Sequence, residues 1–141
     1  MKIKDFQLKI AEALNTVEAL MQGGCKALAE DLLTVSDDVR TQLATVGGVA
    51  IVVTTPNLTR NGCTAGAIPV ETRLSVKCME IVATNREAPG HLTALDAAEI
   101  VAHSLDGAQF NFAAMNQTAD RQSGVLTVSV DFNTTIHLTN E

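Results

Sequence analysis

The sequence predicts an α+β domain in which N-terminal helices and one further helix pack on an antiparallel or mixed four-stranded sheet. Apolar residues recur every three to four positions near the N-terminus, as in an amphipathic helix. Farther along, apolar and polar residues alternate, as in strands with one buried face. Short connections between adjacent strands favour hairpins. The predicted order is helix, helix, strand, strand, helix, strand, strand.

Length and composition fit one domain over residues 1–141 with an aliphatic core. The chain is 46% hydrophobic but has four Phe and no Trp or Tyr. Its formal net charge is -6, without a run of Lys or Arg, which argues against specific nucleic-acid binding. No apolar stretch approaches membrane-spanning length, and charges interrupt the N-terminal MKIKDFQLKI, unlike in a signal peptide.

The first predicted helix covers residues 3–21 and ends at Gly23-Gly24. Its buried stripe consists of Ile3, Phe6, Ile10, Leu14, Val17 and Met21. Residues 25–33 form a short apolar segment that is either helical or irregular.

A second helix is predicted over residues 37–45. Thr34 with Asp37 matches a capping box, and Ser36 is a rival N-cap. Asp37 and Asp38 in the first turn favour the positive end of the helix dipole, so we interpret them as helix-start residues rather than metal ligands.

The segment 49–54 is rich in β-branched residues and apolar on both faces, which predicts a central strand. Pro56 ends this strand because proline cannot donate to a ladder. Residues 57–69 are then expected to form a loop that is too long for a normal hairpin turn, and such loops are often functional.

The next strand is predicted over residues 70–83. Leu74, Val76 and Cys78 alternate with polar residues, and the phase then shifts so that Met79 and Ile81 are apolar. This shift indicates a β-bulge near Cys78–Met79 or burial of both faces there.

The C-terminal half begins with a turn over residues 85–90 and a helix over about 94–106. Thr93 and Asp96 form a capping box, and Gly107 closes the helix. The expected buried face of this helix consists of Leu95, Ala98, Val101, Ala102 and Leu105.

Two final strands are expected to pair with each other. The first carries Phe110, Phe112 and Ala114 on one face, and residues 117–123 follow as a polar turn. The second runs from Leu126 through Leu138 and shows the cleanest alternation in the chain.

Residues that perform chemistry do not gather in any motif. His91, His103 and His137 lack metal-ligand spacing, and Cys25, Cys63 and Cys78 lack CxxC spacing. Phosphate-binding glycine motifs and a nucleophile elbow are also missing from the sequence. We therefore expect no catalytic residues, no cofactor and no metal.

The segment 47–87 is the only one that is not acidic, with four basic and three acidic residues. Its polar residues are either solvated surface or a basic edge that meets acidic surfaces of neighbouring copies. The candidate partner contacts are Asn57, Thr59, Arg60, Asn61, Thr64, Arg73, Arg86 and, in the acidic C-terminal segment, Arg121.

The order of elements resembles that of phage tail terminator and tail-completion proteins, including prophage minor tail proteins. The matching pieces are the N-terminal helix, AEDLLTVSDDVRTQLATVGGVAIVVTTP, the long loop, VETRLSVKCMEIVATNR, TALDAAEIVAHSLDG and GVLTVSVDFNTTIHL. They cover nearly the whole chain.

The resemblance implies a non-enzymatic virion protein, assembled in the bacterial host cytoplasm and located in the tail. It implies a homo-oligomeric ring, commonly a hexamer, that caps the tail tube and meets the head-tail connector. Three alternatives remain: another head-tail joining or tail-completion protein, a small enzymatic or ligand-binding domain around His91, His103 or Cys63, and a nucleic-acid binder, which the charge disfavours.

Overall fold

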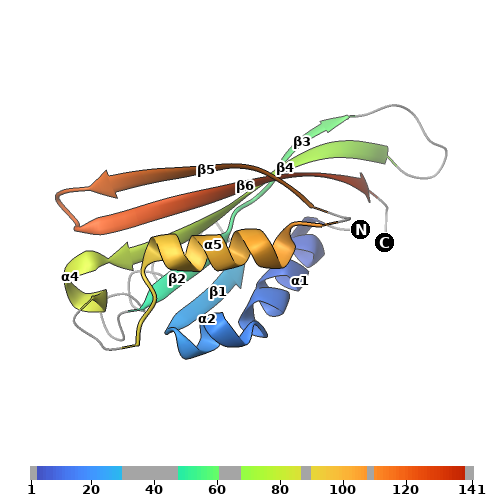
Figure 1. Ribbon diagram of the computed structural model, residues 1–141. Coiled ribbons are helices and arrows are strands. Elements are labelled where there is room, and N and C mark those ends of the chain that lie inside the picture. Colours follow the sequence, from blue (N-terminus) through green and yellow to red (C-terminus); the bar gives the residue numbers. More distant parts are fainter. Residues whose placement is uncertain (1–2, 30–47, 61–67, 87–89, 108–109, 139–141) are drawn as a thin grey trace.

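The computed structural model describes residues 3–29, 48–60, 68–86, 90–107 and 110–138, with only the backbone described at 60, 68–70 and 136–138. It confirms the α+β class and shows a mixed six-stranded sheet with helices packed on one face (Figure 1). The predicted helix over 37–45, with its capping residues and its acidic pair, lies outside the described residues.

The sheet has the strand order β1-β2-β4-β6-β5, and β3 pairs with β4 beside this path. Only β1 and β2 are parallel; the other pairs are antiparallel. The strands are β1 (Cys25–Ala29), β2 (Val49–Val53), β3 (Asn57–Arg60), β4 (Ile68–Ile81), β5 (Asn111–Asp120) and β6 (Val125–Leu138).

The helices in the described part of the chain are α1 (Ile3–Asn15), α2 (Glu18–Gln22), α4 (Val82–Asn85) and α5 (Ala94–Leu105). Residues of α1, α2 and α5 share one core with one face of the sheet. The N-terminal helix was predicted as one piece over 3–21, but it divides at Thr16–Val17, where Val17 is extended. Gly23 and Gly24 end α2 as expected, with Gly24 at φ 78°.

The strands β4 and β6 form the longest pair of the sheet, in register from Ile68↔Leu138 to Ile81↔Val125. Leu74, Val76 and Cys78 are buried on the helix-covered face, opposite buried residues of β6. The predicted bulge near Cys78–Met79 is wrong, because this register is unbroken. The alternative is right: Met79 packs on the opposite face with the buried Ala50 and Val52.

The segment 25–33, expected to be helical or irregular, begins with a strand. Residues 25–29 form β1, which pairs with β2 from Cys25↔Val49 to Ala29↔Val53. Local sequence patterns do not reveal this strand, because its partner β2 is distant in the chain. With β1 on one side and β4 on the other, β2 is buried on both faces, as predicted.

The predicted loop over 57–69 is wrong at both ends. Asn57–Arg60 form β3, and β4 already begins at Ile68. β3 continues β2 along the same side of β4: Val53 pairs with Val76 and Asn57 with Arg73. Three residues on one side thus oppose two on β4, so the extra residue makes a bulge that contains Pro56. Pairing with β4 supplies the strand order that the polar sequence does not suggest.

The C-terminal elements differ from expectation in two places. The Thr93–Asp96 capping box opens α5 as predicted, but Leu95 is exposed, because the helix turns Ala94, Ala97, Ala98 and Val101 to the core. The predicted turn over 117–123 is also wrong: β5 runs to Asp120 in register with β6. The side chains at this end of β5 are exposed, so no burial pattern marks the strand.

Candidate partner interface

A buried carboxylate lies at the end of β4, where the alternation of the strand turns Glu80 into the core. Glu80 is 0% exposed. Its Oε2 accepts a hydrogen bond from Asn85 Nδ2 at 2.5 Å, and its Oε1 lies 3.1 Å from Arg86 Nη2. A buried charge needs such partners. Asn85, the last residue of the short helix α4, and Arg86, its C-cap, supply both partners, so the chain folds back over the strand that precedes it.

Asn85 extends this arrangement to two other elements. Its Nδ2 also donates to Leu92 O at 2.8 Å, so its Oδ1 is the acceptor that faces His91 Nδ1 at 3.0 Å. His91 Nδ1 therefore carries a proton. Leu92 N in turn donates to Gly23 O at 2.9 Å. The Glu80 network, defined as Glu80, Asn85, Arg86 and His91, thus ties α4 to the start of α5 and the end of α2.

Among the described side chains, the histidines and cysteines that an enzyme could use do not converge. His91 precedes α5 and His103 lies in its last turn, and a helix of this length separates them by roughly 15–18 Å. Burial raises the pKa of the Cys25 thiol to about 12 and, with help from Cys25, also raises the pKa of Cys78. Both thiols are protonated at neutral pH and are poor nucleophiles.

The described residues also show no metal site and no membrane-spanning helix. No group of three or more His, Cys, Asp or Glu side chains there is arranged to hold a metal ion. None of the described helices has the length and apolar character needed to cross a membrane.

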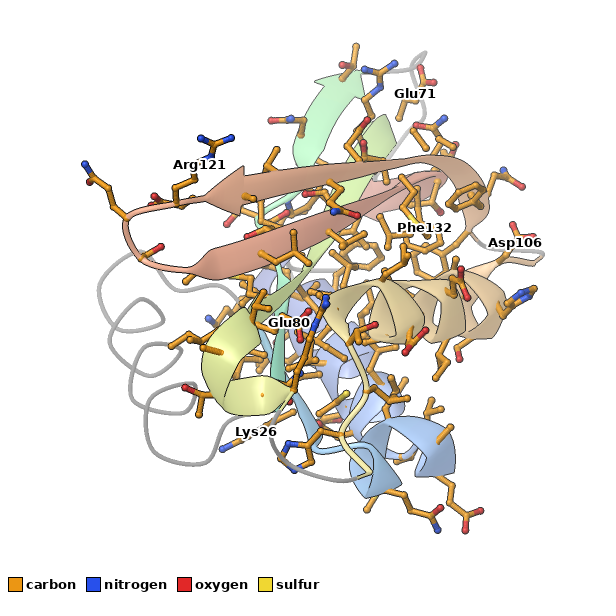
Figure 2. All side chains as sticks on the ribbon, turned by 60° about the vertical axis from the view of Figure 1, so that its left-hand side comes forward. Lys26, Glu71, Glu80, Asp106, Arg121 and Phe132 are labelled. Carbon is orange, nitrogen blue, oxygen red and sulfur yellow. The ribbon has the colours of Figure 1, made fainter. Side chains whose placement is uncertain are left out.

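The predicted partner residues do not form one patch. Asn57, Thr59 and Arg73 are exposed together on the β3–β4 hairpin, with Asn57 opposite Arg73. Arg121 is exposed in the turn between β5 and β6. Figure 2 shows Arg121 near one end of these strands and Glu71, the neighbour of Thr59, far from it on the β3–β4 hairpin.

Arg86 is only partly available to a partner, because its half-exposed side chain forms an ion pair with Glu80. Arg60 is described only by its backbone, and Asn61, Thr64 and Cys63 lie outside the described residues.

The sheet has edges of two kinds. At β1, the Asn15 side chain donates to Ala27 O at 3.0 Å and accepts from Ala27 N at 2.9 Å, so it occupies the outward backbone groups at the middle of this strand. By contrast, β3 pairs only with β4 and β5 only with β6 among the described strands. Unpaired edges of this kind are templates for another strand.

A solved structure shares this fold over nearly the whole chain. It is a chain of a structure described as "Virion of native gene transfer agent (GTA) particle", with a TM-score of 0.63. The match covers 98% of this chain and 100% of that chain at 12% sequence identity, so it shows a common fold. No protein-family model matches the sequence. No curated protein matches it either.

Two features of this region, the burial of Glu80 and the length of β5, were not predicted from the sequence. The burial of Glu80 was available from the alternation of Leu74, Val76 and Cys78, which places residue 80 on the same face. The length of β5 was not available, because the residues NFAAMNQTAD show no periodic burial and are ordered by pairing with β6.

Proposed function

We propose that this chain is a structural subunit of a phage-like virion, and more specifically a tail terminator-like protein. Copies of the chain form a closed ring, commonly a hexamer, at the end of the tail tube. The single observation that carries this proposal is the full-length fold likeness to a chain of the gene transfer agent virion, a phage-like particle.

The described geometry supports a function in binding rather than chemistry. His91 lies before the start of α5 and His103 in its last turn, and both described thiols have raised pKa values. The sheet meanwhile offers two open edges. Under this proposal the partners are further copies of the chain, the tail tube protein and the head-tail connector protein. The protein assembles in the bacterial host cytoplasm and ends in the virion tail.

Binding to tube ends tests the proposal. Purified chain is mixed with tail tubes from the phage or prophage that encodes it, and the mixture is imaged in negative stain. We expect added density at one end of each tube and none along its side. Density distributed along the tube, or none at all with folded protein in excess, would contradict the proposal.

A second candidate within the same class is another head-tail joining or tail-completion protein, since the virion likeness fits any such component equally. The same images separate the two, because a joining protein of the head binds isolated head connectors and leaves tube ends bare.

A further inference from the structure

The outer edge of β5 is unusually free for a strand of ten residues. Its side chains are exposed or half-buried throughout, and its first charged residue is Asp120 at the far end. Apart from the Asp106 carboxylate, which accepts from Phe112 N at 3.0 Å, no described contact covers the backbone groups that point away from β6. Natural proteins usually protect such edges with Lys, Pro or a covering segment.

The only other open edge among the described strands is β3, on the opposite side of the sheet. Both edges carry an exposed large hydrophobic residue: Leu58 on β3 is 36% exposed, and Phe112 on β5 is 43% exposed. Leu58 is in register with the buried Thr72, and Phe112 with the buried Phe132. Both therefore lie on the face of the sheet that the helices cover.

The directions of the strands also match. β3 is antiparallel to β4, β4 to β6, and β6 to β5, so β3 and β5 run in opposite directions within one chain. When one copy is placed beside the next so that their sheets continue, β5 of the first is antiparallel to β3 of the second. Different edges meet in such a contact, so it is heterologous, which is the kind that generates rings.

We propose that β5 of one copy pairs antiparallel with β3 of the next copy, with Leu58 opposite Met115. This inference rests on the proposed function and names the subunit contact of the ring. Met115 is half-buried on the helix-covered face, and Phe112 is the preceding residue on that face because the bulge lies between Phe112 and Ala114. Leu58 thus reaches Met115 directly and Phe112 diagonally.

The same register accounts for the polar residues beside the hydrophobic contact. Asn57 falls opposite Asn116, and both are exposed on the uncovered face. Residue 60, an arginine, comes to the end of β5 where the exposed Asp106 lies; Figure 2 shows Asp106 at the connection from α5 to β5. In this register, position 60 of one copy therefore falls beside Asp106 of the next.

Disulfide cross-linking tests the pairing. In a Cys63→Ser background, Asn57→Cys and Asn116→Cys are combined in one chain, which is assembled and mildly oxidised. Opposed residues of an antiparallel pair have Cα atoms about 4.5–5.5 Å apart, within disulfide reach. Within one copy, two strands separate β3 from β5, so the thiols lie more than about 10 Å apart. We expect a ladder of covalent oligomers that ends at the ring.

Four further variants sharpen the test. Asn57→Cys with Thr118→Cys shifts the pair by two residues on the same face and should cross-link at least about tenfold more slowly. Asn116→Cys alone should stay monomeric under denaturing conditions; dimers would mean that β5 pairs with itself, which overturns the proposal. Leu58→Asp should weaken assembly, whereas Leu95→Asp, equally exposed on α5, should not.

The outcomes separate this pairing from the proposed function. If the measured mass shows a ring but cysteines at 57 and 116 give no ladder of covalent oligomers, the proposed strand pairing is overturned while the proposed ring still stands. A chain that stays monomeric at high concentration and with tube ends overturns both. Circular dichroism of each variant confirms that the subunit itself is folded.

Discussion

Glu80 illustrates how one side chain constrains its surroundings. It is fully buried, and Arg86 and Asn85 face its two oxygens. We predict that Arg86→Ala lowers the free energy of unfolding by about 2 kcal/mol, because it leaves a buried carboxylate with one partner fewer. The half-exposed position of Arg86 keeps this below the cost of breaking a fully buried pair. Urea denaturation measures the change.

Two controls accompany this measurement. Arg121→Ala, in an exposed turn, should change the stability by no more than about 0.5 kcal/mol. In a Glu80→Gln background, Arg86→Ala should cost much less, since the charge that needs the guanidinium is gone. Equal losses for Arg86→Ala in both backgrounds would show that the ion pair has no part in the effect.

The Cys25 thiol offers a second test at this scale. Burial raises its pKa from 9.0 to about 12, so at pH 8 its thiolate fraction falls by about three orders of magnitude. In the Cys63→Ser variant, iodoacetamide should therefore label native Cys25 far more slowly than the urea-unfolded chain, as followed by mass spectrometry. Equal rates would contradict the partly buried position of the Cys25 thiol.

The raised pKa also has a consequence for stability. Above pH 9 the unfolded chain loses the Cys25 proton before the folded chain does, so the folded state binds more protons. The stability that this thiol contributes is present below pH 9 and falls as the pH rises toward 12.

Among elements, β1 and β2 approach closely at Gly24 and Gly48, which directly precede the two strands. Gly48 has φ 76°, and a Cβ built there would lie 2.0 Å from Gly24 O. We predict that Gly48→Ala costs at least about 3 kcal/mol or prevents folding, because backbone at both β1 and β2 would have to move. Thermal unfolding measures the loss.

Gly124→Ala is the matched control, since Gly124 has φ 71° but open space around it. That variant should show only the left-handed backbone strain, about 1–2 kcal/mol. Equal losses of stability for Gly48→Ala and Gly124→Ala would show that Gly48 does not lie close to Gly24.

The elements that sequence patterns revealed are those with a local signal. The β6 alternation and the Thr93 capping box are examples, because burial and capping act within a few residues. β1, β3 and the far half of β5 were missed because their order comes from partners distant in the chain. The polar NLTR of β3, for example, suggests a loop until β4 lies beside it. Of the candidate partner residues, Asn57, Thr59 and Arg73 lie together on β3 and β4, whereas Arg86 and Arg121 lie elsewhere, and their contact with partners stays a prediction.

At the scale of the whole molecule, the sheet connects the fold to the proposed assembly. Asn15 occupies the outward backbone groups of Ala27 at the middle of β1, whereas β3 and β5, among the described strands, have unpaired edges on opposite sides of the sheet. A subunit with two different open edges is suited to head-to-tail contacts, and such contacts close into a ring when the rotation between copies allows it. We therefore expect copies of this chain to form a closed ring.

Native mass spectrometry over a range of concentrations, alone and with tail tube ends, tests that claim most directly. We expect one assembly whose mass is a fixed multiple of 14.9 kDa, commonly six, with no larger species as the concentration rises. A monomer under every condition, or a series of oligomers that grows without limit, would contradict it.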